Sequence, residues 1–366
     1  MVKKSVIFNI SPTQQSSGGI SRYCSELYKH INDRDEFDIR LFPKKIKKKS
    51  INSNLRKIPY AYLLRQKYNN LKFRSFIKSN NESELYHETN YILNDFEKKK
   101  ILTVYDLAWI HFPDFHPKER VNFMEKKFEQ SLKKADAVIT CSKFIKKDII
   151  KNFNINPSKI YPIHLASSSN FKKKIDSITV NNFLKKNKLI NQSFFLLLST
   201  IEPRKNIINT ILAYKNLYTK KEKPLLIIVG YLGWKFEKIK NLIDESDGVI
   251  HFHNISDADL NILLISQKAC IFNSFYEGFG LPIVEAMQFS KPVITSNNSS
   301  MREIAKNYSI LTNPYDIEKI TFYMKKLTDD KEFYDLMCLK SKIGSKNFSW
   351  SNTAKQTLKV YNKLLK

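Results

Sequence analysis

Short apolar runs alternate with longer amphipathic segments along almost the whole chain of 366 residues. Short apolar runs suit strands that are buried on both faces, and apolar residues every three or four positions suit helices packed on a sheet. The first half predicts strands over 5–10, 38–42, 84–87, 100–105, 137–140 and 159–163. It predicts intervening helices over 20–31, 117–133 and 143–152. This alternation is typical of a doubly wound α/β sheet.

A second series of the same kind follows a stretch rich in Ser, Asn and Lys over 165–179, which we interpret as a linker. The expected strands are 194–199, 225–229, 249–252, 269–272, 292–295 and 309–311. The expected helices are 206–217, 257–266, 281–289 and 317–328. A helical tail over 331–366 closes the chain, so the pattern predicts two α/β domains in tandem.

Composition agrees with two packed cores, because 42% of the residues are hydrophobic and the chain exceeds the roughly 250–300 residues at which a single core stops growing. The sequence contains no apolar run of about eighteen residues, the length that suggests a membrane span. The N-terminal stretch has a short apolar run and no small-residue cleavage site, so we do not interpret it as a signal peptide. We therefore expect a cytoplasmic protein. Its four scattered cysteines are expected to be buried apolar residues.

Positive charge is concentrated in the N-terminal half. The net charge is +27, and residues 1–175 hold 35 Lys and Arg against 17 Asp and Glu. Residues 40–78 hold thirteen basic residues and no acidic ones, interleaved with aromatic and aliphatic side chains. Such a segment suits an anionic membrane surface, where each Lys or Arg contributes about 1 kcal/mol; a solvated basic face is the alternative. We expect no nucleic-acid binding, because no nucleic-acid-binding motif accompanies the charge.

Glycine residues point to a candidate ligand site. Six of the eight glycines form three close groups: Gly18 with Gly19, Gly230 with Gly233, and Gly278 with Gly280. Each group follows an expected strand and precedes an expected helix, which is where an open α/β sheet binds ligands. The alternative is three helix-entry turns without a ligand. A G-x-G-x-x-G sequence is absent, which disfavours a dehydrogenase.

Two motifs in the second half carry the candidate chemistry. The segment 199–206, STIEPRKN, places Arg204 and Lys205 at a helix entry, where a guanidinium and an ammonium can neutralise a diphosphate. The segment 274–287, SFYEGFGLPIVEAM, places Glu277 in a loop and Glu285 in the helix that follows. Carboxylates so placed can bind different parts of one elongated ligand.

The second motif resembles the E-x7-E signature of retaining glycosyltransferases of family 4, which are two-domain enzymes of the GT-B fold. Other segments match the family in the same order along the chain: 17–23 (SGGISRY), 86–91 (YHETNY), 103–107 (TVYDL), 138–144 (VITCSKF), 202–206 (EPRKN) and the closing 348–361. Within the family, the sequence is most similar to mannosyltransferases of O-antigen and capsule assembly.

The resemblance implies an α/β protein of the GT-B fold, with two Rossmann-like doubly wound domains facing across a cleft. The acceptor-side domain would span 1–168, the nucleotide-sugar domain 169–345, and a helix over 346–366 would return to the N-terminal domain. The implied reaction is a retaining transfer of a hexose from a nucleotide-diphosphate sugar, GDP-mannose first and a UDP-sugar second, without metal or cofactor. The expected acceptor is a lipid-linked oligosaccharide of a surface polysaccharide. The enzyme would then be peripheral on the inner face of the cytoplasmic membrane.

The resemblance also implies residue functions. Arg204 and Lys205 would hold the donor diphosphate and stabilise the leaving group, and Glu277 would contact the transferred sugar, so these three are the expected catalytic residues. Glu285 would contact the ribose. The other expected donor contacts are Gly18, Gly19, His87, Asp106, Gly278, Phe279, Gly280 and Leu281.

Three positions depart from the family pattern. Tyr105 stands where the family often has a His near the donor sugar, and His87 is the candidate substitute. Ser290 replaces a usual Gly and Asn273 replaces a common Pro. The Tyr105 departure keeps one alternative open, a catalytically silent relative that acts as a membrane-associated scaffold. A nucleotide-sugar epimerase on the same fold is the other.

Two D-x-D strings raise the question of a metal-dependent transferase. The first, at Asp33 and Asp35, lies in a charged turn after an expected helix. In the second, Ser256 and Asp259 form a capping box ahead of an apolar helix. We therefore expect no metal site.

Overall fold

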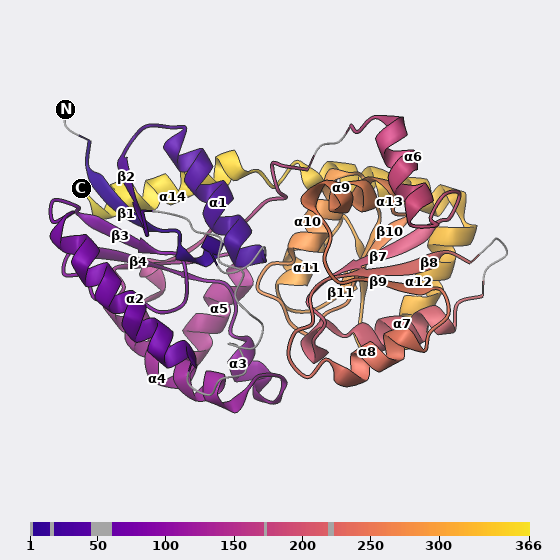
Figure 1. Cartoon of the computed structure of the whole chain (residues 1–366), viewed down its shortest axis with the longest axis horizontal. Coiled ribbons are helices and arrows are strands. Elements are labelled where there is room, and N and C mark those ends of the chain that lie inside the picture. Colours follow the sequence, from indigo (N-terminus) through magenta and orange to yellow (C-terminus); the bar gives the residue numbers. More distant parts are fainter. Residues whose placement is uncertain (1–2, 15–17, 45–60, 172–173, 219–222) are drawn as a thin grey trace. The chain divides into compact units, whose positions relative to one another are not determined.

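The computed structural model describes residues 3–14, 18–44, 61–171, 174–218 and 223–366, without the side chains of 61–66. Within these ranges, two six-stranded sheets lie in two separate compact units (Figure 1). Unit 1 comprises Met1–Pro113, Pro117–Leu165 and Trp350–Lys366, and unit 2 comprises Asp114–His116 and Ala166–Ser349. The chain thus passes into unit 2 after Leu165 and returns to unit 1 after Ser349; the sequence placed these boundaries at 168 and 345.

The sheet of unit 1 has the strand order β2-β1-β3-β4-β5-β6, and each neighbouring pair is parallel. Its strands are β1 (Ser5–Asn9), β2 (Asp38–Phe42), β3 (Leu85–Glu88), β4 (Lys99–Val104), β5 (Ala137–Thr140) and β6 (Ile160–Pro162). Its helices are η1 (Ser11–Gln14), α1 (Gly19–Asn32), α2 (Ala61–Lys78), α3 (Ala108–His111), η3 (Pro113–Phe115), α4 (Lys118–Lys134), α5 (Lys143–Asn152), η4 (Pro157–Lys159) and α14 (Trp350–Leu364).

The sheet of unit 2 has the order β12-β11-β10-β7-β8-β9 and is also parallel throughout. Its strands are β7 (Phe194–Leu198), β8 (Leu225–Val229), β9 (Val249–Phe252), β10 (Ala269–Phe272), β11 (Val293–Ser296) and β12 (Ile310–Thr312). Its helices are α6 (Ser177–Lys186), η5 (Pro203–Lys205), α7 (Ile207–Lys215), α8 (Glu237–Asp244), α9 (Asp257–Ser266), α10 (Leu281–Gln288), α11 (Ser299–Ala305), α12 (Ile317–Asp329) and α13 (Lys331–Ser345).

The strand predictions are confirmed, and both ends of each strand lie within one residue of the expected position. The helix predictions were less complete, because α2, α3, α6, α8 and α11 were not foreseen. Helix α6 begins inside the stretch interpreted as linker, where the Asp176 side chain accepts a hydrogen bond from the Thr179 amide and caps the helix. The expected tail consists of two helices, α13 in unit 2 and α14 in unit 1.

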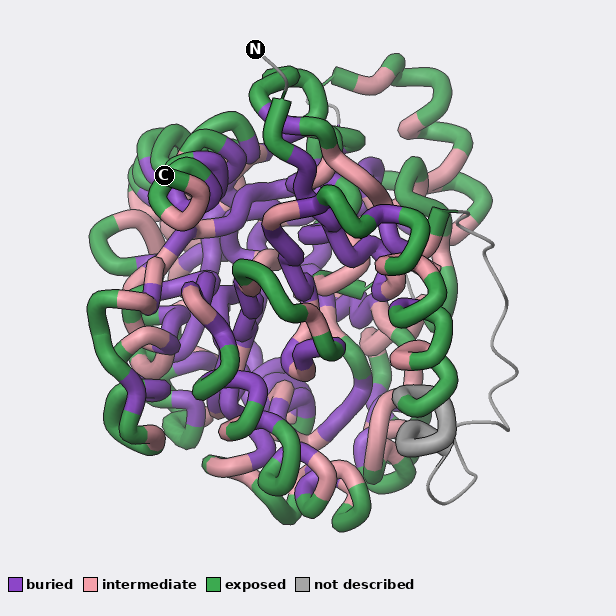
Figure 2. Tube along the Cα trace, turned by 90° about the vertical axis from the view of Figure 1, so that its left-hand side faces the viewer, coloured by how far each residue is buried: buried purple, intermediate pink, exposed green. Residues whose placement is uncertain are grey.

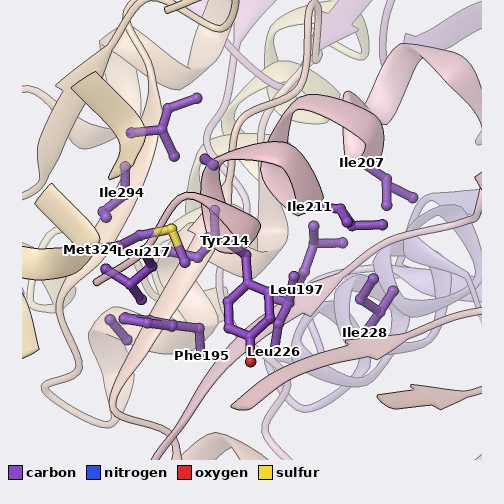
Figure 3. Packing of buried hydrophobic residues seen from close by; sticks show 14 of the residues in the cluster. Phe195, Leu197, Ile207, Ile211, Tyr214, Leu217, Leu226, Ile228, Ile294 and Met324 are labelled. Carbon is purple, nitrogen blue, oxygen red and sulfur yellow. The ribbon is translucent and has the colours of Figure 1, made fainter. Parts of the chain in front are cut away.

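The core of unit 2 shows why these runs fold as they do. Helix α7 directs Ile207, Ile211 and Tyr214 onto the apolar face of β7 and β8, which contributes residues such as Leu197 and Ile228 (Figure 3). All five residues are almost completely buried. Full burial of such a side chain stabilises the fold by roughly 1.5–3 kcal/mol. Figure 2 shows the same segregation along the chain, with buried stretches (purple) in the strands and exposed stretches (green) on helix faces and turns.

The C-terminal helix α14 packs within unit 1. Its Thr353 hydroxyl donates to the His164 carbonyl at 2.6 Å, and its Tyr361 hydroxyl lies 2.7 Å from Nδ1 of His87. Tyr361 is fully buried. These contacts join α14 to the sheet of unit 1, whose first strand is β1.

None of the helices in the described ranges combines the length and apolarity needed to cross a bilayer.

Candidate active site

The candidate site lies at the topological switch point of the unit 2 sheet. Strands β7 and β10 are neighbours, yet the chain proceeds from β7 toward β8 and β9 on one side and from β10 toward β11 and β12 on the other. The loops after β7 and β10 therefore leave the sheet in opposite directions, which opens a crevice suited to ligands. These loops carry the two motifs singled out in the sequence, 202–206 and 274–280.

Four charged side chains meet there. Lys205 Nζ lies 2.5 Å from Glu277 Oε1, and Arg204 Nη1 lies 3.2 Å from Glu277 Oε2. Arg204 Nη2 also contacts Glu202 Oε1 at 2.8 Å. Each of these side chains is between 10% and 12% exposed, so the ion pairs are only weakly screened by solvent. Glu202, to which the sequence analysis gave no function, orients the Arg204 guanidinium.

Glu277 is an anion throughout the working pH range. Burial alone raises the pKa of a carboxyl group, but the adjacent Lys205 and Arg204 outweigh burial and hold the pKa of Glu277 at about 2. The cluster therefore joins two fixed cations to two acidic residues before any ligand arrives.

The backbone explains how these side chains come together. Pro203 begins the short helix η5. Asn206 follows it in a left-handed conformation (φ 56°), which separates η5 from α7. The Phe275 amide donates to the Arg204 carbonyl at 2.9 Å, and Arg204 Nη1 donates to the Tyr276 carbonyl at 2.7 Å. The two loops are thus cross-linked through main-chain groups as well as through charges.

The start of α11 holds the Glu277 backbone in place. The Glu277 amide donates to Ser299 Oγ at 3.2 Å, and Ser300 Oγ donates to the Glu277 carbonyl at 2.8 Å. Asn298 Nδ2 donates to the Phe275 carbonyl at 3.0 Å. The sequence analysis missed these three residues; the polar cluster NNSS directly after an apolar strand was the available signal.

Helix α10 begins directly after the glycine loop. Its N-cap Gly280 has φ 100°, a conformation that side-chain-bearing residues rarely adopt. Leu281 is the first residue of α10, and Phe279 is buried against Phe348 with ring centroids 5.9 Å apart. Glu285 lies within α10 and is 2% exposed.

Comparison with known proteins agrees with this geometry. Residues 180–338 match the family model described as glycosyl transferases group 1. The chain is 30% identical to O-antigen chain mannosyltransferase B of Escherichia coli, over 98% of this chain and 100% of that protein. The chain belongs to the group 1 glycosyltransferases.

Two further relatives are also mannosyltransferases. The serotype-specific mannosyltransferase WbdA of Escherichia coli is 30% identical over 68% of this chain and 31% of that protein. The O-antigen chain mannosyltransferase RfbU of Salmonella typhimurium is 26% identical over 68% of this chain and 69% of that protein.

Solved structures show the GT-B fold. Sucrose-phosphate synthase of Thermosynechococcus elongatus superposes with a TM-score of 0.77 at 17% identity, covering 99% of both chains. WaaG, a glycosyltransferase involved in lipopolysaccharide biosynthesis, gives 0.70 at 15% identity, over 97% of this chain and 99% of its own. The GT-B prediction is therefore confirmed.

The switch point of unit 1 is built differently. There Asn9, at the end of β1, donates to Glu88 Oε1 at 2.7 Å. Glu88, at the end of β3, also accepts from the Asn90 amide, the Tyr86 hydroxyl and Asn94 Nδ2. Burial raises the pKa of Glu88 to about 8, because its partners are neutral.

The other expected contacts of unit 1 lie near this edge. Gly18 is the N-cap of α1 and Gly19 its first residue. Asp106 follows β4, and its Oδ1 accepts from the Tyr91 hydroxyl at 3.1 Å and from the Ala108 amide at 3.3 Å. Asp106 thus fixes the start of α3.

His87 has a structural position. It is completely buried, with Nε2 2.8 Å from Thr103 Oγ1 and Nδ1 2.7 Å from the Tyr361 hydroxyl. Burial lowers the pKa of His87 to about 3, so the ring is neutral. Both ring nitrogens are therefore used within unit 1, where His87 links α14 to the sheet. Tyr105 is itself buried and donates to the Thr89 carbonyl at 2.7 Å.

The remaining departures have physical explanations. Ser290 adopts φ 57°, the left-handed conformation for which the family's usual Gly is best suited. Asn273 uses its carbonyl to accept from Asn206 Nδ2, a contact that a Pro carbonyl can also make.

Gly230 and Gly233 are required for packing. A Cβ at Gly230 would lie 1.8 Å from the Ser199 carbonyl oxygen, and one at Gly233 would lie 2.6 Å from Thr200 Cγ2. The loop after β8 passes this closely because Leu232 forms an isolated parallel bridge with Ile201 in the loop after β7. This glycine group therefore has a structural explanation that needs no ligand.

The D-x-D strings also have structural explanations. Asp33 is the C-cap of α1. Ser256 Oγ accepts from the Asp259 amide at 3.0 Å and caps α9, as the capping box predicted. Among the described residues, no three His, Cys, Asp or Glu side chains are placed to hold a metal ion.

Proposed function

We propose that this glycosyltransferase moves mannose from GDP-mannose to a lipid-linked glycan of a surface polysaccharide. The observation that carries the proposal is the meeting of Arg204, Lys205 and Glu277 at the switch point of unit 2. The choice of mannose, and of a polysaccharide acceptor, is supported by the O-antigen mannosyltransferases to which the chain is similar. A UDP-sugar is the second donor candidate.

The proposed donor contacts follow the geometry. Arg204 and Lys205 bind the diphosphate, Arg204 as a fork and Lys205 as a point charge. Glu277, anchored by the same two cations, accepts hydrogen bonds from the sugar hydroxyls. The backbone from Gly278 to Leu281 contacts sugar and phosphate, Glu285 contacts the ribose, and Gly18, Gly19 and Asp106 contribute from unit 1.

The proposed transfer retains the anomeric configuration. The bond between C1 and the phosphate oxygen breaks, the electron pair leaves with the nucleoside diphosphate, and the acceptor oxygen bonds C1 on the same face. The acceptor proton passes to the leaving phosphate. The low pKa of Glu277 supports this step, because a carboxylate with a pKa of about 2 is a weak base.

The proposed reaction needs no metal ion. Arg204 and Lys205 are fixed cations within reach of one carboxylate, and such preorganised charge stabilises a leaving phosphate without reorganisation. We expect full activity in excess EDTA.

Membrane binding is the last part of the proposal. The basic segment 40–78 lies partly outside the described residues, since 45–60 are not described. Helix α2 buries Phe73 and exposes Tyr68 (56%) and Leu71 (64%) next to Lys72. This combination of exposed apolar and basic side chains supports contact with an anionic surface. Two cations of the segment are already paired, Arg40 with Asp38 and Arg74 with Asp95.

Transfer from GDP-mannose to a synthetic polyprenyl-diphosphate oligosaccharide tests the proposal. Wild type should form GDP and an extended product whose new linkage has the donor's anomeric configuration, and Glu277→Ala should not. Equal, null activity of both proteins with every donor would favour the scaffold alternative, and an epimerised donor without acceptor would favour the epimerase. Membrane binding is contradicted if vesicles with anionic lipid fail to sediment the protein at low salt.

A further inference from the structure

We infer that Asn206 is a positioning residue that ties three loops of unit 2 together and thereby aims Arg204 and Lys205. This inference rests on the proposed function of those two cations. Asn206 directly follows Lys205 and is 3% exposed. The sequence analysis assigned it no function.

The Asn206 amide group joins the loops after β10 and β12. Its Nδ2 donates to the Asn273 carbonyl at 2.9 Å and to the Pro314 carbonyl at 2.6 Å. An amide nitrogen has two hydrogens, so both are used, and each goes to a different loop. Because Asn206 itself belongs to the loop after β7, a single side chain links the ends of three strands.

The Asn206 backbone determines where the preceding cations point. Asn206 has φ 56° and ψ 35°, and it is the residue between η5 and α7. Its carbonyl accepts from the Thr210 amide, so it also begins α7. Asn tolerates the left-handed conformation better than most residues. The residue type therefore satisfies two requirements at once, a left-handed turn and a double donor.

The contacts of Asn206 extend the series of contacts that holds the two motifs, 202–206 and 274–280, together. Arg204 contacts Phe275 and Tyr276 through main-chain groups, Lys205 contacts Glu277, and Asn206 contacts Asn273. Loss of the Asn206 amide would remove the two side-chain links from this segment to the loops after β10 and β12. A misplacement of about 1 Å in a binding group can cost a hundredfold in rate.

Asn206→Gly separates the two requirements, because Gly keeps the left-handed backbone and removes only the amide. We expect it to remain folded, to bind GDP about tenfold more weakly and to lose about tenfold or more in kcat/KM. Asn206→Ala, which also strains the backbone, should lose more stability. Asn209→Ala is the matched control, since Asn209 Nδ2 donates to the same Pro314 carbonyl at 3.2 Å and lies one turn further along α7.

Three measurements decide the matter: GDP affinity, kcat/KM well below the melting temperature, and hydrogen exchange of the Phe275 and Lys205 amides. Faster exchange in Asn206→Gly than in Asn209→Ala supports the inference, even if wild type shows no transfer and the proposed function fails. Unchanged exchange and unchanged GDP affinity in Asn206→Gly would overturn it. A drop in melting temperature alone, with normal kcat/KM, would also overturn it.

Discussion

The two switch points of the molecule share a topology and differ in electrostatics. In each unit a glutamate lies at or beyond the carboxyl end of one strand of the switch-point pair, Glu88 as the last residue of β3 and Glu277 in the loop after β10. Glu88 is surrounded by neutral donors and burial raises its pKa to about 8. Glu277 is held by Lys205 and Arg204, and its pKa is about 2. The same residue type in the same kind of place is therefore neutral in one unit and charged in the other.

This electrostatic difference bears on which unit would bind the donor phosphates. A doubly wound sheet offers a crevice at its switch point whatever side chains line it. Unit 2 directs two buried cations into that position. This difference in charge supports the proposal that the activated sugar binds to unit 2.

The largest effect is expected for Lys205→Met. This substitution keeps the length of the side chain and removes its charge, so the leaving diphosphate loses a preorganised partner. We expect kcat to fall by about 100- to 1,000-fold, as measured by release of GDP in the presence of acceptor. A fall of less than threefold would break the assignment of phosphate chemistry to unit 2.

Glu277→Gln and Glu88→Gln form a matched pair. Glu277→Gln frees Lys205 and Arg204 from their counter-charge, so we expect GDP to bind more tightly while transfer falls roughly tenfold or more. Glu88→Gln should leave GDP affinity unchanged, because Glu88 contacts no cation among the residues that the structure describes. Calorimetric titration of both variants with GDP checks this, and weaker GDP binding by Glu277→Gln would contradict it.

The two glutamates should also change the stability of the fold with pH in opposite directions. The pKa of Glu277 is lowered from 4.5, so its contribution is present above about pH 4.5 and is lost as pH falls toward 2. The pKa of Glu88 is raised, so the folded protein holds a proton that the unfolded chain releases, and stability is lost as pH rises from about 4.5 to 8.

Melting temperatures of wild type and Glu88→Gln between pH 5 and 8.5 measure the second effect. The melting temperature of the variant should rise relative to that of wild type as pH increases. A difference that stays constant across this range would show that Glu88 is ionised in the folded protein.

The smallest effect is expected for His87→Asn. The substitution removes the link to Tyr361 and leaves a small space beside α14, so we expect a stability loss of about 1–3 kcal/mol. Donor KM should not change, because His87 is buried between β4 and α14. Thermal unfolding measures the loss of stability, and donor titration measures KM. A changed KM would support the expected contact of His87 with the donor.

Sequence patterns were enough to predict the two α/β units, the positions of the strands and the two motifs of unit 2. Apolar runs of strand length indicate strands that are buried on both faces, and each run can be recognised from its own residues alone. The motifs 202–206 and 274–280 both precede helices. That they serve one site was implied by the family resemblance.

The environment of each polar residue became evident from the three-dimensional structure. The family resemblance assigned Glu277 to catalysis and His87 to donor contact; in the structure His87 is buried against Tyr361, whereas two cations keep Glu277 charged. Asn206, Ser299 and Ser300 were overlooked, because their partners lie in loops far along the chain. Gly230 belonged to a glycine group with two possible explanations, a ligand site or a helix-entry turn, and the close approach of the Ser199 carbonyl explains this glycine without a ligand. Hydrogen bonding and electrostatics depend on neighbours in space, which the spacing of residues along the chain does not specify.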